Sequence, residues 1–144
     1  MASNDSPKTA ARNHTEESIR ETVETTLGKD FLTEAINSEY LRIRTPKQLP
    51  DGTLLDIFIR PSKDGYLVTD LGESLSLVHI RIPQPEGSPE PLNTARNICK
   101  DLQVTLALGI QLETYSRDWT QLTHNILRVA EAALAIAWKY EKES

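Results

Sequence analysis

The sequence predicts a single α+β domain. An antiparallel sheet of about four strands, a three-stranded meander and one later strand, packs with N-terminal, middle and long C-terminal helices. Residues 53–60 and 66–72 are rich in β-branched and aromatic side chains and are separated by a turn at Asp64 and Gly65, as in an antiparallel hairpin. Apolar residues recur at helical spacing on both sides of this hairpin. The 144 residues are enough to enclose one hydrophobic core.

The N-terminal region is expected to contain a disordered tail followed by a helix. Residues 1–12 are polar and bury little apolar area, so the domain is expected to comprise residues 13–144. Asn13 followed three residues later by a glutamate fits a capping box. The helix therefore starts at Asn13 or Thr15 and stops at Gly28. Its apolar face consists of Ile19, Val23 and Leu27.

Before the central hairpin, the chain is expected to form a short helical piece and one half-exposed strand. Residues 30–36 are predicted to form a short second helical piece, and residues 40–46 a strand in which apolar residues alternate with Arg42 and Arg44. One face of that strand can be buried while both guanidinium groups reach solvent. Residues 53–60 are apolar on both faces, so this strand is expected to be central, with other parts of the chain covering each side.

The chain beyond the hairpin is expected to alternate between helix and strand. Residues 73–79 favour a short helix over a strand, and the proline-rich residues 83–91 an irregular loop. An asparagine cap and apolar residues at every fourth position predict a helix over 93–108. Alternating apolar and polar residues predict a strand over 110–115. The last helix is expected to run from residue 118 to residue 140.

The C-terminal helix has more apolar surface than one sheet can bury. Its apolar residues are spaced alternately three and four apart, and others widen that seam. A helix packed on one sheet needs a single apolar stripe. We therefore expect a homodimer, and the expected interface consists of Ile126, Leu127, Ala130, Leu134, Ala137 and Trp138. The alternative is that the N-terminal helix covers the second stripe within one chain.

Composition excludes several classes of function. Twenty-one acidic and sixteen basic residues give a net charge of −5, which disfavours nucleic-acid partners. A single cysteine, Cys99, excludes an internal disulfide and a cysteine-based zinc site, and the three histidines lie on distant segments. No apolar run approaches the about 20 residues that cross a bilayer, and no signal-peptide or phosphate-loop pattern is present. We expect a cytosolic protein without membrane insertion and without a cofactor.

Three carboxylates around the hairpin invite comparison with metal-dependent nucleases. Such enzymes hold a divalent cation with carboxylates beside a lysine, and Asp51, Asp56 and Asp70 lie on neighbouring turns and strands. Asp51 follows a proline, as in the first dipeptide of the nuclease motif, but the acid-x-lysine pattern is missing from the next strand. Asp51 is more simply a turn former, and Asp70 more simply caps the helix after Gly72.

The basic and aromatic residues of the sheet leave a second hypothesis open. Arg42, Arg44 and Arg60, together with Tyr66 and other aromatic side chains, could form a platform on which single-stranded bases stack. The simpler interpretation is that the arginines form a solvated sheet face and that the aromatic side chains belong to the core.

The segment 45–73 carries a resemblance to a known family. The residues concerned are Thr45-Pro46, Pro50-Asp51-Gly52, Asp56 to Ile59 and Gly65 to Glu73. In these residues the chain resembles the bacterial and phage family known as domain of unknown function 1828, and the similarity extends over residues 40–140. The resemblance implies a small α+β domain from a bacterium, a phage or a mobile element, and it implies no activity.

These observations favour a non-catalytic protein-interaction or regulatory module, such as a phage or mobile-element inhibitor that binds a host protein. One alternative is a metal-dependent nucleic-acid enzyme built on Asp51, Asp56 and Asp70. The other is a single-stranded nucleic-acid binder that uses the three arginines.

Overall fold

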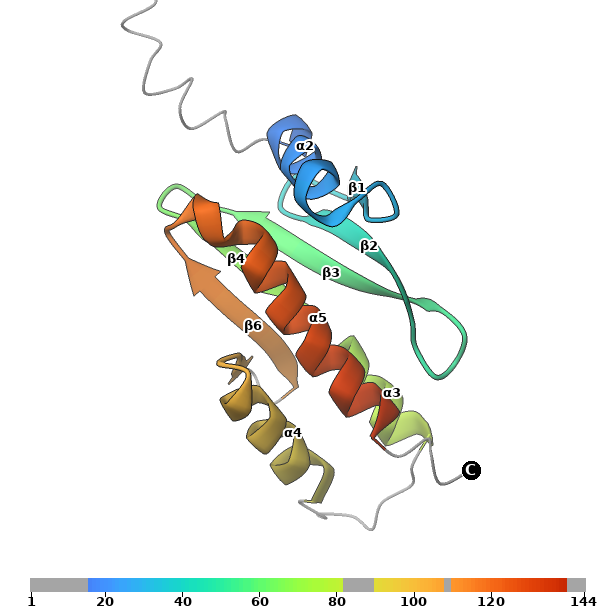
Figure 1. Cartoon of the computed structure of the whole chain (residues 1–144). Helices are drawn as coiled ribbons and strands as arrows, with labels where there is room; N and C mark the ends of the chain where they lie inside the picture. Colours follow the sequence, from blue (N-terminus) through green and yellow to red (C-terminus); the bar gives the residue numbers. More distant parts are fainter. Residues whose placement is uncertain (1–15, 82–89, 108–109, 140–144) are drawn as a thin grey trace, which may run out of the picture.

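The computed structural model describes residues 16–81, 90–107 and 110–139 (Figure 1). It confirms the predicted α+β class, and the C-terminal helix is long. The elements in chain order are α2 (Glu16–Leu27), β1 (Leu32–Ala35), β2 (Leu41–Gln48), β3 (Leu54–Pro61), β4 (Tyr66–Thr69), α3 (Glu73–Arg81), α4 (Glu90–Asp101), β5 (Thr105–Ala107), β6 (Gln111–Ser116), η1 (Trp119–Gln121) and α5 (Leu122–Trp138).

The strands form one antiparallel sheet in the order β1-β2-β3-β4-β6-β5. The described residues therefore contribute six strands, and the prediction of about four is wrong. The hairpin of β3 and β4 lies in the middle of the sheet, so the expected central position of residues 53–60 is confirmed. Every neighbouring pair is antiparallel. This includes β4 and β6, which are separated in the chain by α3, α4 and β5.

The two edge strands were not expected from the sequence. Residues 30–36 were predicted to be helical, but Leu32–Ala35 pairs with β2 as β1. Four residues are too few to establish a period, so pairing with the neighbouring strand decides their conformation. The helix predicted over 93–108 ends at Asp101 as α4, and Thr105–Ala107 forms β5. The chain changes direction at Gln103, which has a positive φ of 59°.

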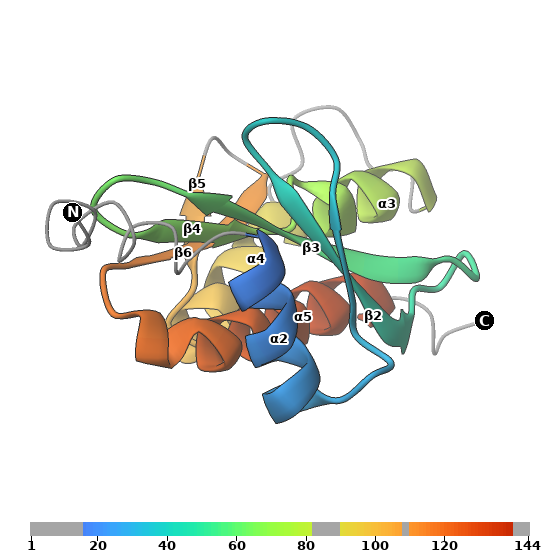
Figure 2. The ribbon, with the colours of Figure 1, turned by 90° about the horizontal axis from the view of Figure 1, so that it is seen from above.

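Helices α2 and α5 lie on the same side of the sheet, which we call the helix-covered face (Figure 2). The side chains of Ile57 and Ile59 on β3 point into this layer and are fully buried. The opposite side, called the open face, carries a row of cross-strand neighbours, Glu34, Arg42, Phe58, Thr69, Glu113 and Thr105. Here Phe58 is buried beside Tyr40, whose ring meets it edge-on with centroids 6.4 Å apart.

The helices differ from their predicted bounds mainly at the ends. Residues 73–79 are helical as predicted, within α3, which packs against α5. The last helix starts as the short 3-10 turn η1, capped by Asp118, and continues as α5. The predicted tail over residues 1–12 and most of the proline-rich loop lie outside the described residues. Within the described ranges, no helix combines the length and the apolar character needed to span a bilayer.

Candidate functional site

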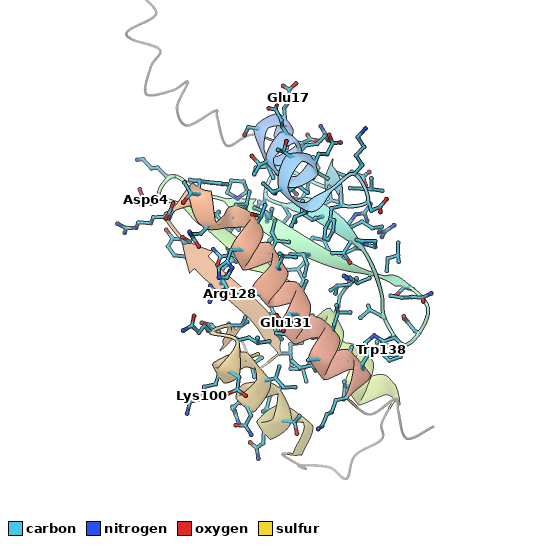
Figure 3. The ribbon with its side chains drawn as sticks, in the orientation of Figure 1. Glu17, Asp64, Lys100, Arg128, Glu131 and Trp138 are labelled. Carbon is cyan, nitrogen blue, oxygen red and sulfur yellow. The ribbon has the colours of Figure 1, made fainter. Side chains whose placement is uncertain are left out.

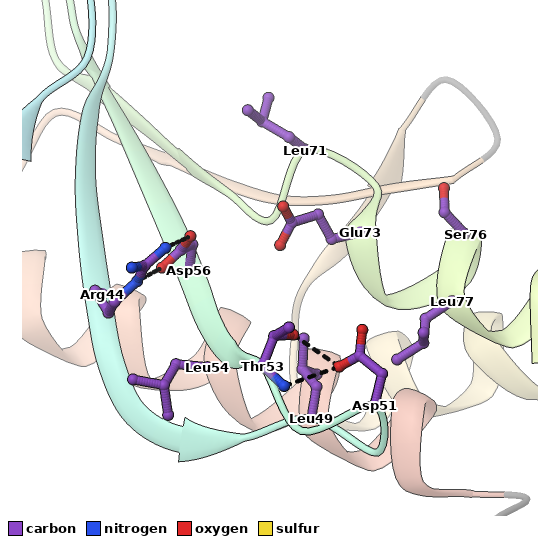
Figure 4. A pocket seen from close by; sticks show the side chains of 10 residues that line it. All are labelled: Arg44, Leu49, Asp51, Thr53, Leu54, Asp56, Leu71, Glu73, Ser76 and Leu77. Atoms are coloured by element: carbon purple, nitrogen blue, oxygen red, sulfur yellow. Dashed lines mark hydrogen bonds and ion pairs between the residues drawn. The ribbon is translucent and has the colours of Figure 1, made fainter.

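A pocket of about 430 Å³ opens between the arm of the β2–β3 hairpin and the turn that joins β4 to α3 (Figure 4). Its walls combine acidic side chains, one arginine and several leucines. The lining residues are Arg44, Leu49, Asp51, Thr53, Leu54, Asp56, Leu71, Glu73, Ser76 and Leu77. The pocket therefore offers both apolar surface and charge to a bound group.

The hairpin wall is shaped by a tight turn. The Leu49 amide donates to the Thr53 carbonyl at 2.7 Å, and Gly52 has a φ of 92° that favours glycine. The carboxylate of Asp51 accepts hydrogen bonds from the amide and the hydroxyl of Thr53, at 3.1 and 2.7 Å. At the base of the arm, the indole nitrogen of Trp138 donates to the Gln48 carbonyl at 2.9 Å and ties the hairpin to α5.

The opposite wall depends on the fully buried side chain of Asp70. Its Oδ1 accepts from the amides of Gly72 and Leu112, at 2.8 and 3.0 Å. Its Oδ2 accepts from the amide and the hydroxyl of Ser74, at 3.2 and 2.7 Å. These bonds hold together the end of β4, the first turn of α3 and strand β6. They fix a turn in which two consecutive residues, Leu71 and Gly72, have positive φ, and so they place Glu73 at the pocket mouth.

An ion pair crosses the floor of the pocket. Arg44 donates from Nε and Nη2 to the two carboxylate oxygens of Asp56, both at 2.9 Å. This paired geometry is a strong form of charged hydrogen bonding. The hydrogen bond and the charge of Asp56 raise the pKa of Arg44. Asp56 is almost fully buried and has both oxygens engaged by the same guanidinium group.

Glu73 has the most perturbed carboxylate in this pocket. Its side chain lies at the surface, but crowding against the pocket wall removes water from the carboxylate and raises its pKa to about 7. The charges of Asp56, Asp70 and Asp51 raise it further, and only Arg44 acts in the opposite direction. The carboxylates around this pocket therefore outweigh its single guanidinium group, and a cation entering it would relieve their repulsion.

The three carboxylates of the nuclease hypothesis occupy different environments. Asp51 and Asp56 line the pocket, whereas Asp70 lies behind its wall with four hydrogen bonds to the protein. Across the described parts of the chain, no three histidine, cysteine or acidic side chains gather closely enough to hold a metal ion. The observed role of Asp70 is the helix cap anticipated from the sequence, extended by its bond to β6.

The predicted binding residues do not form one platform. Arg42 pairs with Glu34 and Arg44 with Asp56, both on the open face, and Arg60 is exposed on the same face. Tyr66 lies on the helix-covered face and is fully buried, which contradicts its assignment to the binding group. Because side chains alternate along a strand, Tyr66 faces α5 and its hydroxyl donates to the Asp118 carbonyl at 2.9 Å.

The residues of the predicted dimer interface are also divided. Ile126, Ala130 and Ala137 are buried in the core of their own chain, and α2 packs against α5 without covering Leu127 and Trp138 of the second stripe. Leu134 is partly buried against that core, whereas Leu127 and Trp138 are 43% and 45% exposed. The homodimer remains a prediction, and the surface left for it is the stripe of Leu127, Leu134 and Trp138.

Sequence reasoning missed Glu73 as a functional candidate. An acidic residue just after a turn is common in the first turn of a helix, where it interacts favourably with the helix dipole. Nothing in the local pattern distinguishes Glu73 from such a residue. Its high pKa arises first from desolvation of the carboxylate and then from the charges of Asp56 and Asp70, which the fold brings near it.

Comparisons with protein-family models, with curated proteins and with solved structures find no match for this chain. The resemblance to domain of unknown function 1828 thus stays a prediction.

Proposed function

We propose that the chain is a non-catalytic protein-interaction module that holds a basic side chain of a partner protein in the pocket between the β2–β3 arm and α3. The observation that carries this proposal is the excess of carboxylates in a concave, partly apolar site. Among the described lining residues, Asp51, Asp56 and Glu73 share the pocket with one guanidinium group, that of Arg44.

A lysine or arginine side chain matches both parts of this lining. Such side chains place their aliphatic stems on apolar surface and keep the charged end in a polar environment. Leu54, Leu71 and Leu77 offer the apolar surface, and Glu73 and Asp51 the polar end. Figure 4 shows the carboxylates of Asp51 and Glu73 on separate sides of the pocket, so a charged group between them could interact with both.

The electrostatics of the pocket favour the same ligand. Asp56 is already neutralised by Arg44, whereas the pKa of Glu73 is raised to about 7, first by desolvation and then by the charges of Asp56 and Asp70, which Arg44 offsets only in part. A bound ammonium or guanidinium group would favour the ionised form of Glu73. The net charge of −5 adds a long-range attraction for basic partners.

The same features disfavour a nucleic-acid backbone in this pocket. A phosphate would meet carboxylates of its own sign, and both Arg42 and Arg44 already form ion pairs with carboxylates. A phosphate ligand would have to displace those partners. Arg60 remains exposed on the open face, but one arginine gives little affinity for a backbone.

Titration with capped amino acids tests the proposal directly. The probes are N-acetyl-lysine amide and N-acetyl-arginine amide, with N-acetyl-norleucine amide and N-acetyl-glutamate amide as controls, followed by amide chemical shifts in two-dimensional NMR. We expect saturable shifts in residues 49–56 and 71–77 with the basic probes only. We also expect binding to strengthen between pH 6 and pH 8, because Glu73 ionises in that interval.

Two variants complete the test. Glu73→Gln is expected to weaken binding by about tenfold, because it removes a charge that faces the ligand. Asp64→Asn removes an exposed carboxylate in the β3–β4 turn, outside the pocket, and is expected to change nothing. Equal shifts with the basic and acidic probes, or an equal response of the two variants, would refute the proposed pocket.

A further inference from the structure

A second cleft lies beside the N-terminal half of α5. It has a volume of about 270 Å³ and lies between the end of β6, the first turns of α5 and the turn that follows α4. Figure 3 shows Arg128 here and Trp138, which supports the first pocket, near the other end of the helix. The lining residues are Gln103, Tyr115, Ser116, Gln121, His124, Asn125 and Arg128.

The cleft exists because β5 is shorter than β6. The two strands pair from Thr105 opposite Glu113 to Ala107 opposite Gln111. Continued by two residues, this register would place Gln103 opposite Tyr115. Gln103 instead adopts a φ of 59°, which turns the chain away from the sheet. After Glu113, β6 therefore remains paired with β4 but has no paired strand among the described residues on its β5 side, and the cleft lies at this unpaired edge.

Arg128 brings a positive charge into this notch, and within the described ranges it forms no ion pair with a carboxylate. Its Nη1 donates to the carbonyl and to the side-chain oxygen of Gln103, at 3.0 and 3.3 Å, and its Nη2 donates to Asn125 Oδ1 at 2.7 Å. All three acceptors are neutral. Arg20, Arg42 and Arg44, by contrast, each form an ion pair. The Nε of Arg128 is buried and has no hydrogen-bond partner within the described part of the chain.

A buried hydrogen-bond chain fixes the orientation of this arginine. Asn125, which is 3% exposed, donates from Nδ2 to the Tyr66 hydroxyl at 3.0 Å, and that hydroxyl donates to the Asp118 carbonyl. The Asn125 side chain can therefore present only its oxygen to Arg128. A guanidinium group held in this way loses little conformational freedom when it binds a ligand.

We propose that this cleft binds a small oxyanion, the chemistry shared by a phosphate group and a carboxylate, with Arg128 as its positively charged centre. Further polar side chains at the rim come from Gln121 and His124, and from Ser116, whose hydroxyl donates to the Asp118 carbonyl and accepts from the Asp118 amide. Charged and hydroxyl or amide donors on an otherwise neutral wall are the usual means of holding an oxyanion. The carboxylate of Asp118 accepts hydrogen bonds from the amide and the hydroxyl of Thr120, at 3.0 and 2.6 Å, so it is occupied by the η1 cap.

The test is an NMR titration of the full chain with potassium phosphate and, separately, with sodium acetate, at constant ionic strength set by chloride. We expect saturable shifts of the Arg128 Nε–H signal and of the amides of Gln103, Ser116 and Gln121. Shifts with phosphate alone identify a phosphoryl ligand, shifts with acetate alone a carboxylate, and shifts with both a general oxyanion site. Shifts that do not saturate, or that chloride produces equally, would overturn the proposal.

Variants separate binding from the structural role of Arg128. Arg128→Gln is expected to abolish binding, but it also removes the hydrogen bonds to the turn at Gln103. Gln121 and His124 are exposed and carry no side-chain bond of that network, so the double variant Gln121→Ala, His124→Ala is expected to stay folded and to bind severalfold more weakly. Arg60→Gln, an exposed arginine elsewhere on the sheet, is the matched control and should bind as the unaltered chain does. An unchanged affinity in the double variant would contradict the assignment of the cleft.

Discussion

Replacement of Asp70 by alanine is expected to lower the free energy of unfolding by about 3–5 kcal/mol. The substitution leaves four buried donors without their acceptor: the amides of Gly72, Ser74 and Leu112, and the Ser74 hydroxyl. An unsatisfied buried donor costs about 1–3 kcal/mol, and the four costs overlap because one rearrangement of the turn can relieve several of them. A helix cap alone would account for only about 1 kcal/mol.

The matched control is Asp118→Ala. Asp118 also caps a helix and accepts two hydrogen bonds, from the amide and the hydroxyl of Thr120, but its side chain is exposed. We expect this variant to lose much less stability than Asp70→Ala, because a solvated cap leaves no buried donor unsatisfied. The difference between the two losses in free energy of unfolding measures what burial and the bond to β6 contribute beyond helix capping.

Urea unfolding followed by tryptophan fluorescence and far-ultraviolet circular dichroism measures both variants. If both probes give the same transition and the denaturant slope is unchanged, unfolding is two-state and the free energies of the variants can be compared. Equal losses for Asp70→Ala and Asp118→Ala would refute the argument that Asp70 joins β4, α3 and β6. A third variant, Asp70→Asn, should lose more stability than Asp118→Ala and less than Asp70→Ala. It keeps an acceptor for two backbone amides but directs an NH₂ group at the Ser74 amide.

Four further outcomes follow from the structure. Ile57→Ala removes a fully buried side chain of the central strand and should cost about 2–5 kcal/mol in chemical denaturation; a loss below about 0.5 kcal/mol would mean that this face is not packed. Folding raises the pKa of Glu73 from 4.5 to about 7, so the group favours the folded state at low pH and loses this effect as pH rises through 7. Thermal melts at pH 4.5, 6 and 8 should show the melting temperature of Glu73→Gln gaining on that of the unaltered chain as pH rises, and a constant difference would be inconsistent with the shift. Burial raises the pKa of the Cys99 thiol to about 11, so an aromatic disulfide reagent at pH 8 should label it only as fast as the protein opens, and immediate labelling would show that the thiol is accessible. Light scattering is expected to find a dimer, twice the chain mass of 16.2 kDa, which Leu127→Glu should convert to a monomer; a monomer without any substitution would eliminate the α5 interface.

The sequence determined those elements whose signals are local. The central hairpin is defined by β-branched residues and by a turn at Asp64 and Gly65. Helix α5 is long enough for its apolar period to be unmistakable. The α+β class follows from these two elements, because each depends on residues that are neighbours in the chain.

Only the tertiary structure decided which distant residues meet. Arg44 reaches Asp56 because the register of β2 on β3 places them opposite each other, and a shift by one residue would have turned their side chains to opposite faces. Tyr66 is a core residue because side chains alternate along a strand and its position on β4 directs it to the helix-covered face. The pKa of Glu73 depends on Asp56, which the β3–β4 hairpin brings near it. Strands β1 and β5 form for a related reason: segments of four and three residues have little conformational preference of their own, so hydrogen bonds to the neighbouring strands determine them.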